Sequence, residues 1–172
     1  DFDDLIMKSV EILQKYSEVK LKYRSRFKHI LVDEYQDTNH AQYQLIRELV
    51  GEESDPIPAA ELCVVGDADQ SIYSFRAADF TILMGFQDDF GDGAPDDATR
   101  TMVKLEENYR STTPVLYTAN SLIKNNAGRR PKSLWSRNHG SEPVRLIATQ
   151  DEKEESDMIA KEVESARFAS NQ

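Results

Sequence analysis

The strongest constraint on the fold is a set of four short apolar runs that alternate with helical patterns. The runs occupy residues 30–32, 62–65, 102–105 and 144–148. Runs of this length predict strands that are buried on both faces of a sheet. Strands that alternate with helices predict an α/β fold whose sheets are parallel.

Four segments between or beside these runs carry helical patterns. We expect a helix capped by Asp4, a second over residues 42–50, a third over 113–124, and a last one opened by a capping box of Asp151 and Glu154. The apolar residues expected to face inward are Leu5, Ile6, Val10 and Leu13 in the first helix, and Met158, Ile159 and Val163 in the last. Two loops, 51–60 and 85–101, contain glycine, proline and aspartate, and the second places a domain boundary near residue 100.

The charge of the chain is unevenly distributed. The net charge is -10, and residues 51–103 carry two basic side chains against twelve acidic ones. Residues 104–140 reverse this balance, with seven basic side chains against two acidic ones. An acidic surface keeps a protein soluble, so charge alone does not predict binding to nucleic acid.

The remaining composition predicts a cytoplasmic location and no membrane partner. No apolar run approaches the length of a membrane span. The single cysteine, Cys63, lies in an apolar run and is expected to be a buried structural thiol. One cysteine forms no internal disulfide, which fits a reducing compartment.

Two adjacent carboxylates follow the first predicted strand. Asp33 and Glu34 come directly after the run 30–32. Ligands of open parallel sheets gather at the carboxyl ends of strands, where an aspartate can hold Mg²⁺ and a glutamate can activate water. Many strands end in acidic residues simply because they reach solvent, and the pair alone favours that simpler explanation.

A polar turn and two aromatic residues follow the second predicted strand, in the string GDADQSIYSFRA at 66–77. Gln70 offers an amide to a ligand. Tyr73 and Phe75, with Arg76 beside them, form either a platform on which unpaired bases stack or a pair of core residues.

Three strings resemble motifs of the UvrD/PcrA/Rep family of superfamily 1 DNA helicases. The string DEYQDTN at 33–39 resembles motif II, the string at 66–77 resembles motif III, and LEENYRS at 105–111 resembles motif IV. Weaker likenesses are DFDDLI at 1–6, RPK at 130–132 and LW at 134–135.

The resemblance implies a role for each motif residue toward ATP, Mg²⁺ or single-stranded DNA. Asp33 would hold Mg²⁺, with Glu34 contacting the metal through water and activating the attacking water. Gln70 would sense the terminal phosphate, while Tyr73 and Phe75 would contact single-stranded DNA and Arg76 would link the two sites. Tyr109 would stack on adenine, and Arg110 would reach the γ-phosphate as an arginine finger.

Two positions depart from the family pattern. Phe75 stands where many relatives have tryptophan, so stacking is expected to weaken but persist. Ala77 replaces a glycine, which predicts a turn that needs no positive φ at this position. Arg129, Arg130 and Lys132 would either bind phosphates or form a solvated loop.

The resemblance implies parts of two RecA-like P-loop NTPase motor domains. Residues 1–100 would be the C-terminal part of domain 1A, and residues 101–172 the N-terminal part of domain 2A. The sequence has no G-x-x-x-x-G-K-[ST] string, so the P-loop is expected upstream and the chain alone is expected to be inactive. Partial domains expose sheet edges and apolar surface, which predicts self-association.

The activity implied is ATP-driven movement along single-stranded DNA and unwinding at duplex junctions, in repair or replication. One alternative is a helicase–nuclease motor of the RecB/AddA type. The other is a non-catalytic DNA-binding adaptor built on a decayed motor.

Overall fold

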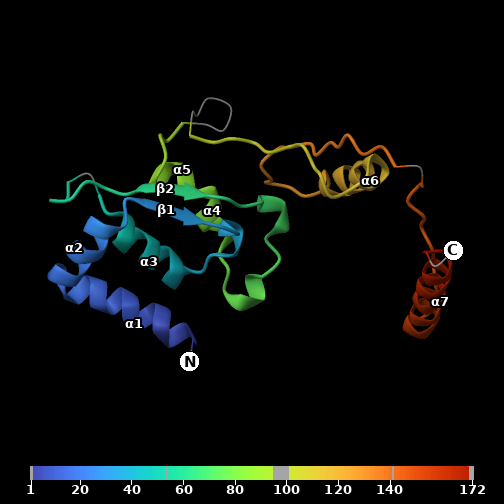
Figure 1. Cartoon of the computed structure of the whole chain (residues 1–172), viewed down its shortest axis with the longest axis horizontal. Coiled ribbons are helices and arrows are strands. Elements are labelled where there is room, and N and C mark those ends of the chain that lie inside the picture. The colour runs from blue at the N-terminus through green and yellow to red at the C-terminus, as the bar shows by residue number, and fades with distance from the viewer. Residues whose placement is uncertain (1, 53, 95–100, 141, 171–172) are drawn as a thin grey trace. The chain divides into compact units, whose positions relative to one another are not determined.

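The computed structural model of the 172-residue chain describes residues 2–52, 54–94, 101–140 and 142–170. The chain forms two compact units (Figure 1). The first contains residues up to 106 together with 123–133, and the second contains residues 107–122 and those from 134 onward. The boundary predicted near residue 100 lies outside the described residues.

A two-stranded parallel sheet organises the first unit. Strand β1 (His29–Val32) pairs with β2 (Glu61–Val64), and Ile30 lies opposite Leu62 in the register. The two strands predicted at 30–32 and 62–65 are therefore confirmed. The helix between them, α3 (His40–Val50), makes the crossover that a parallel pair requires.

Only one face of this sheet is covered within the described residues. Its inner side chains pack on a core of Tyr35, Ile46, Val50, Ile82 and Leu83. The partly buried residues that join this core from the strands are Ile30, Val32, Leu62 and Val64.

The opposite face carries Leu31, which is 78% exposed, and Val65, which is 52% exposed, and Cys63 is exposed as well. The expectations of burial on both faces and of a buried Cys63 are therefore wrong for this structure. A continuous apolar run places every second side chain on the far face, and no described element covers that face.

Two helices precede the sheet. They are α1 (Phe2–Lys15) and α2 (Ser17–Arg26), and α1 packs against α2 and α3 (Figure 1). Leu13 is buried as expected, whereas Leu5 is 64% exposed. The helix begins before Asp4, so that residue lies in the first turn and the predicted cap is wrong.

Sequence reasoning missed α2 because its apolar residues show no helical period. A buried arginine holds the helix in place. Arg24 is 7% exposed, pairs with Asp55 at 2.5 Å, and donates to the carbonyl of Glu48 at 2.8 Å. Lys20 also pairs with Glu48, at 2.6 Å. The polar contacts of α2 therefore supply an anchor that an apolar pattern does not reveal.

Helix α3 begins two residues before the predicted start because Asn39 caps it. The Asn39 side chain accepts from the backbone N–H of Gln42 at 3.0 Å, and the Gln42 side chain accepts from the Asn39 N–H at 2.9 Å. This reciprocal pair is a capping box with glutamine in the third helical position. Two short helices, α4 (Phe80–Met84) and α5 (Phe86–Asp89), complete the core of the first unit.

The second unit contains α6 (Thr113–Ile123) up to residue 122, and this helix nearly matches its predicted range; the unit also contains α7 (Glu152–Ser170). Asp151 caps α7, since its carboxylate accepts from the Glu154 N–H at 2.8 Å. The expected inward face of α7 is wrong, because Ile159 is 57% and Val163 is 62% exposed. No described helix is both long enough and apolar enough to cross a membrane.

The strands predicted at 102–105 and 144–148 do not form. Both segments have no regular secondary structure, and Val103, Leu105 and Leu146 are 79%, 78% and 99% exposed. A strand needs a neighbour for its backbone groups, and neither segment has one among the described residues. These runs have the composition of strands but lack a sheet to join here.

Candidate functional site

The first candidate element is the acidic pair at the carboxyl end of β1. Asp33 and Glu34 are both exposed, and the Glu34 N–H donates to the Asp33 carboxylate at 2.9 Å. Glu34 has a φ of 51°, in the left-handed region. That conformation costs a non-glycine residue about 1–2 kcal/mol, and such strain clusters at functional sites.

A buried glutamine joins this pair to the turn after β2. Gln36 is 2% exposed, and its amide nitrogen donates to Glu34 Oε2 at 2.6 Å. Its amide oxygen accepts from the backbone N–H of Asp67 at 3.0 Å. Gln36 was not singled out from the sequence. Its position between Glu34 and Asp37, inside the string that resembles motif II, was the feature that could have identified it.

Gly66 is required for this close approach. A Cβ at this position would lie 3.0 Å from the Gln36 amide oxygen and 3.3 Å from the Gln36 backbone nitrogen. Any side chain would therefore press on the contact between the two motifs, and this explains the glycine in physical terms.

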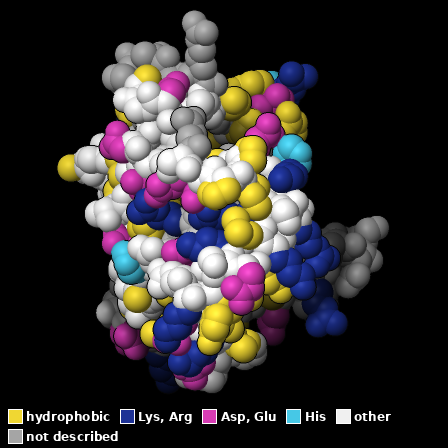
Figure 2. Space-filling model, turned by 90° about the vertical axis from the view of Figure 1, so that its left-hand side faces the viewer, with side chains coloured by type: hydrophobic (Ala, Val, Ile, Leu, Met, Phe, Trp, Pro, Cys, Tyr) yellow, Lys and Arg dark blue, Asp and Glu magenta, His cyan; other side chains and the backbone are white. Residues whose placement is uncertain are grey.

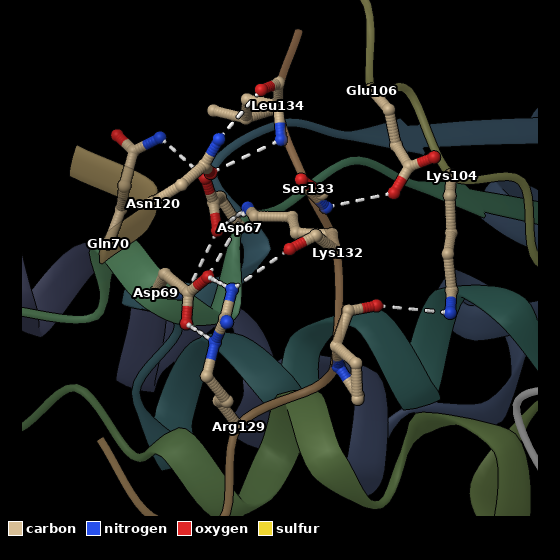
Figure 3. Close-up of polar contacts among 11 residues, drawn as sticks. Asp67, Asp69, Gln70, Lys104, Glu106, Asn120, Arg129, Lys132, Ser133 and Leu134 are labelled. Atoms are coloured by element: carbon tan, nitrogen blue, oxygen red, sulfur yellow. Dashed lines mark hydrogen bonds and ion pairs between the residues drawn. The ribbon is translucent and has the colours of Figure 1, made fainter. Parts of the chain in front are cut away.

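The turn after β2 is organised around Asp67. Its carboxylate accepts from the Asp69 N–H at 2.9 Å and from the Gln70 amide nitrogen at 2.8 Å (Figure 3). Burial raises the pKa of Asp67, but the hydrogen bonds from Lys132, Gln70 and the Asp69 backbone outweigh burial and lower the pKa overall. The carboxylate therefore stays ionised and holds the Gln70 amide.

Two basic side chains from the segment 123–133 bind this turn (Figure 3). Arg129 donates from Nε and Nη2 to the two oxygens of Asp69, at 3.1 and 2.8 Å. Lys132 forms an ion pair with Asp67. Arg129 is 15% and Lys132 is 22% exposed in the side chain, so neither belongs to a solvated loop and both meet carboxylates.

Arg130 also differs from the sequence-based expectations. Its guanidinium donates to the carbonyl of Met84 at 3.0 Å and contacts the sulfur of Met102 at 3.3 Å. These contacts tie the basic segment to α4.

On the face of the molecule shown in Figure 2, basic and acidic side chains are interspersed.

The aromatic residues after this turn are exposed. Tyr73 is 37% and Phe75 is 75% exposed, and their ring centroids lie 5.8 Å apart. The Arg76 guanidinium lies over both rings, 5.2 Å from the first centroid and 5.5 Å from the second. Exposed rings with a neighbouring cation suit stacking with bases better than a role in the core.

Ala77 corrects an expectation about the backbone. Its φ is 60°, so the turn does need a left-handed residue although glycine is absent. The Ala77 N–H donates to the Ser74 carbonyl at 3.0 Å, and Ala78 then bridges to Asn39. These contacts on both sides hold the strained residue in place.

In the second unit, Asn108 shapes the loop that carries Tyr109 and Arg110. The Asn108 side chain accepts from the N–H groups of Arg110 and Ser111, at 3.0 and 2.7 Å. Its own N–H donates to the Trp135 carbonyl at 2.7 Å. The backbone of the loop is therefore fixed before any ligand binds.

The side chains on this loop extend outward. Tyr109 is 84% exposed and donates its hydroxyl to Glu107 at 3.0 Å, a hydrogen bond that raises the pKa of Tyr109. Arg110 is exposed, and no described carboxylate pairs with it. Both side chains are available to a ligand.

The first unit thus brings together Asp33, Glu34 and Gln70 through Gln36 and Asp67. Tyr73, Phe75 and Arg76 follow on the same stretch of chain. Among the described residues, no group of three or more His, Cys, Asp or Glu side chains could hold a metal ion by itself.

Comparisons with known proteins agree with these motifs. Residues 1–91 match the model of the UvrD/REP helicase N-terminal domain, and residues 103–172 match that of the UvrD-like helicase C-terminal domain. The chain is 51% identical over 166 residues to ATP-dependent DNA helicase UvrD1 of Mycobacterium tuberculosis, covering 96% of this chain and 21% of that protein. It is 41% identical over 163 residues to ATP-dependent DNA helicase PcrA of Staphylococcus aureus, covering 95% of this chain and 20% of that protein.

The chain thus spans about a fifth of the length of these relatives. The first family model covers more than half of the chain and includes the acidic pair, the Asp67 turn and the aromatic residues. The second includes Tyr109 and Arg110. The chain belongs to the UvrD/REP family of helicases.

Proposed function

We propose that this chain is the middle part of an ATP-dependent DNA helicase that moves along single-stranded DNA and unwinds duplex junctions, in DNA repair or replication. Residues 1–100 would belong to the first RecA-like motor domain and residues 101–172 to the second. The observation that carries the proposal is the continuous hydrogen-bonded path from Glu34 through Gln36 and Asp67 to Gln70. A protein that only bound DNA would have no chemical need for this path.

The acidic pair suits Mg²⁺ bound together with ATP. Mg²⁺ uses oxygen ligands and is usually held by one or two carboxylates, with phosphates and water completing the shell. Asp33 accepts the Glu34 N–H with one carboxylate oxygen, and the exposed Glu34 lies next to it in the sequence. Asp33, directly, and Glu34, through water, would hold this metal, which would supply positive charge against the phosphates.

The protein's own residues would divide the remaining work of hydrolysis. Glu34 would orient and deprotonate the attacking water, and Gln36 fixes the Glu34 carboxylate for this role. Gln70 would meet the terminal phosphate. Tyr109 would stack on the adenine, and Arg110 would stabilise charge on the transferred phosphoryl group.

The exposed aromatic residues would bind single-stranded DNA. Stacking on aromatic side chains tolerates any base sequence, which suits a motor that moves along a strand. Phe75 presents the most exposed ring, and Arg76 lies over both rings. Arg76 would also connect the DNA to the turn that carries Gln70.

This chain on its own is expected to hydrolyse no ATP, because it contains no P-loop string. The uncovered face of the sheet, with Leu31, Cys63 and Val65 exposed, would pack against further parts of the motor domain. The isolated chain is expected to self-associate through such apolar surface.

The test is ATP hydrolysis and strand unwinding by the full-length helicase, with and without single-stranded DNA. We expect turnover that DNA stimulates and unwinding that requires ATP. A full-length protein that binds DNA without hydrolysing ATP would support the adaptor alternative instead. A protein that also degrades DNA in the presence of ATP would support the helicase–nuclease alternative.

A further inference from the structure

Two cations of the segment 123–133 neutralise two carboxylates of the turn after β2. Arg129 makes a two-point contact with Asp69, and Lys132 pairs with Asp67 while lying 3.8 Å from Asp69. All four side chains are mostly buried, with exposed fractions between 11% and 22%. A further bond from Arg129 Nη2 to the Lys132 carbonyl, at 3.3 Å, fixes the two cations relative to one another.

An arrangement of this kind specifies geometry more than it adds stability. Partly buried ion pairs lose much of their attraction to the cost of removing charge from water, so they are weak evidence for a stabilising role. The two parallel N–H···O bonds between Arg129 and Asp69 instead fix the direction of the carboxylate. Without the cations, the adjacent charges of Asp67 and Asp69 would repel each other and also repel a nucleotide's phosphates.

The fixed Asp67 carboxylate determines the orientation of the Gln70 amide. An ionised carboxylate only accepts hydrogen bonds, so the NH₂ group of Gln70 must face Asp67. Figure 3 shows the amide oxygen of Gln70 on the side away from Asp67. That oxygen and the second N–H are then presented in one defined orientation.

We propose that Arg129 and Lys132 are positioning residues for Gln70: through Asp67 and Asp69 they hold the Gln70 amide ready for the terminal phosphate of ATP. The inference rests on the proposed function of the chain as part of an ATP-driven motor. It assigns the basic segment a role in nucleotide turnover, in place of contact with DNA phosphates.

The experiment uses the full-length helicase with Lys132→Ala, which removes the partner of Asp67. We expect kcat for DNA-stimulated ATP hydrolysis to fall by about ten- to a hundredfold, since a misplacement of about 1 Å can cost 10²-fold, with KM for ATP changed less than about threefold. Affinity for single-stranded DNA and its dependence on salt should stay unchanged, since Lys132 faces a carboxylate. Lys132→Arg, which keeps a cation, should recover most of the turnover.

Lys124→Ala is the matched control. Lys124 is exposed on the same segment, so the substitution removes the same charge without touching the turn. We expect wild-type turnover. Equal losses in Lys124→Ala and Lys132→Ala would overturn the inference in favour of a general charge effect.

A second comparison tests whether Lys132 acts through Gln70. If it does, Lys132→Ala should add little to the loss already caused by Gln70→Ala, because residues that act as a unit are not additive. If the losses in kcat of the two single variants multiply in the double variant, the inference is contradicted. It is also contradicted if Lys132→Ala weakens DNA affinity and reduces the dependence of log affinity on log salt by about one, because that is the sign of a lost phosphate contact. Arg129→Ala provides an independent variant should Lys132→Ala fail to fold.

Failure of this inference differs from failure of the proposed function. If the wild-type helicase is active and the Lys132→Ala and Arg129→Ala variants have the same kcat, only the positioning role is refuted. A wild-type protein without DNA-stimulated hydrolysis would remove the proposed function itself.

Discussion

The turn that carries Gln70 and the loop that carries Arg110 are built on opposite plans. In the first, Asp67 binds Gln70, and Lys132 in turn pairs with Asp67. In the second, Asn108 fixes the backbone, and the side chains of Tyr109 and Arg110 extend outward. Among the described residues, no carboxylate pairs with the Arg110 guanidinium. The side chains of the first region are organised before any ligand arrives, whereas those of the second extend into solvent, with Tyr109 bonded only through its hydroxyl to Glu107.

This difference fits a division of labour in phosphoryl transfer. Groups that orient water and sense phosphate gain from a preset geometry, because they then need no rearrangement at the moment of reaction. An arginine finger is useful when it arrives with a conformational step, so it should not be held in a permanent ion pair. Changes in the organised region should therefore affect both stability and turnover, while changes at Arg110 should affect turnover alone.

The largest expected effect is that of Arg110→Ala. The proposed arginine-finger role predicts that kcat for ATP hydrolysis by the full-length helicase falls by about 10³–10⁵, with no change in thermal stability. Arg110→Lys should recover little, since the planar fork of arginine matches phosphate oxygens and the ammonium does not. A variant that loses stability along with turnover would break the comparison between the two regions.

The next effect concerns DNA binding by the aromatic residues. Phe75→Ala should weaken affinity for single-stranded DNA by about five- to hundredfold, the value of one base stacked on an aromatic ring. Phe75→Trp should strengthen it, because a larger ring offers more stacking surface. Fluorescence anisotropy with a labelled oligonucleotide measures both affinities. Tyr16→Ala is the control, because Tyr16 is an exposed aromatic residue distant from Phe75 in the sequence. Equal weakening by the control would contradict the assignment.

Gln36→Ala tests the organised region directly. It leaves the Asp67 N–H without its acceptor and frees the Glu34 carboxylate, so we expect a loss of about 1–3 kcal/mol in stability together with a lower kcat. Thermal unfolding and steady-state turnover of the full-length helicase measure the two quantities. Gln44→Ala, on α3, should change neither; an unchanged Gln36→Ala variant would remove the link between the two motifs.

The smallest effect is a gain in stability. The left-handed conformation of Ala77 costs about 1–2 kcal/mol, and Ala77→Gly removes this strain. Glycine also adds conformational freedom to the unfolded chain, so the net gain in the free energy of unfolding should be below about 1 kcal/mol. Thermal unfolding against wild type measures it. A loss of stability would mean that contacts of the Ala77 methyl group outweigh the strain.

Local patterns predicted much of the first unit. The two strands that pair and the helix between them follow from apolar patterns, although the Asn39 cap and the two residues it adds to α3 were not predicted. The acidic pair and Gln70 follow the two strands, as expected, but their roles were inferred from the motif strings and not from their places alone. These features depend on neighbours in the sequence, which a reader of the sequence can see.

Features that depend on distant partners could not be predicted. Gln36 and Asp67 are 31 residues apart, and Arg129 and Asp69 are 60 apart, so no local pattern reveals either contact. The runs at 102–105 and 144–148 failed as strands because pairing requires a neighbour and not only composition. The prediction that Ala77 needs no positive φ was wrong because contacts around the residue impose a backbone conformation that alanine disfavours.

The measurement that tests the account most directly is DNA-stimulated ATP turnover by the full-length helicase carrying Glu34→Gln, beside its affinity for ATP. The account predicts that kcat falls by about 10²–10⁴, the contribution of a general base, while ATP still binds. Turnover near the wild-type value in this variant would contradict the role assigned to Glu34 and to the organised region around it.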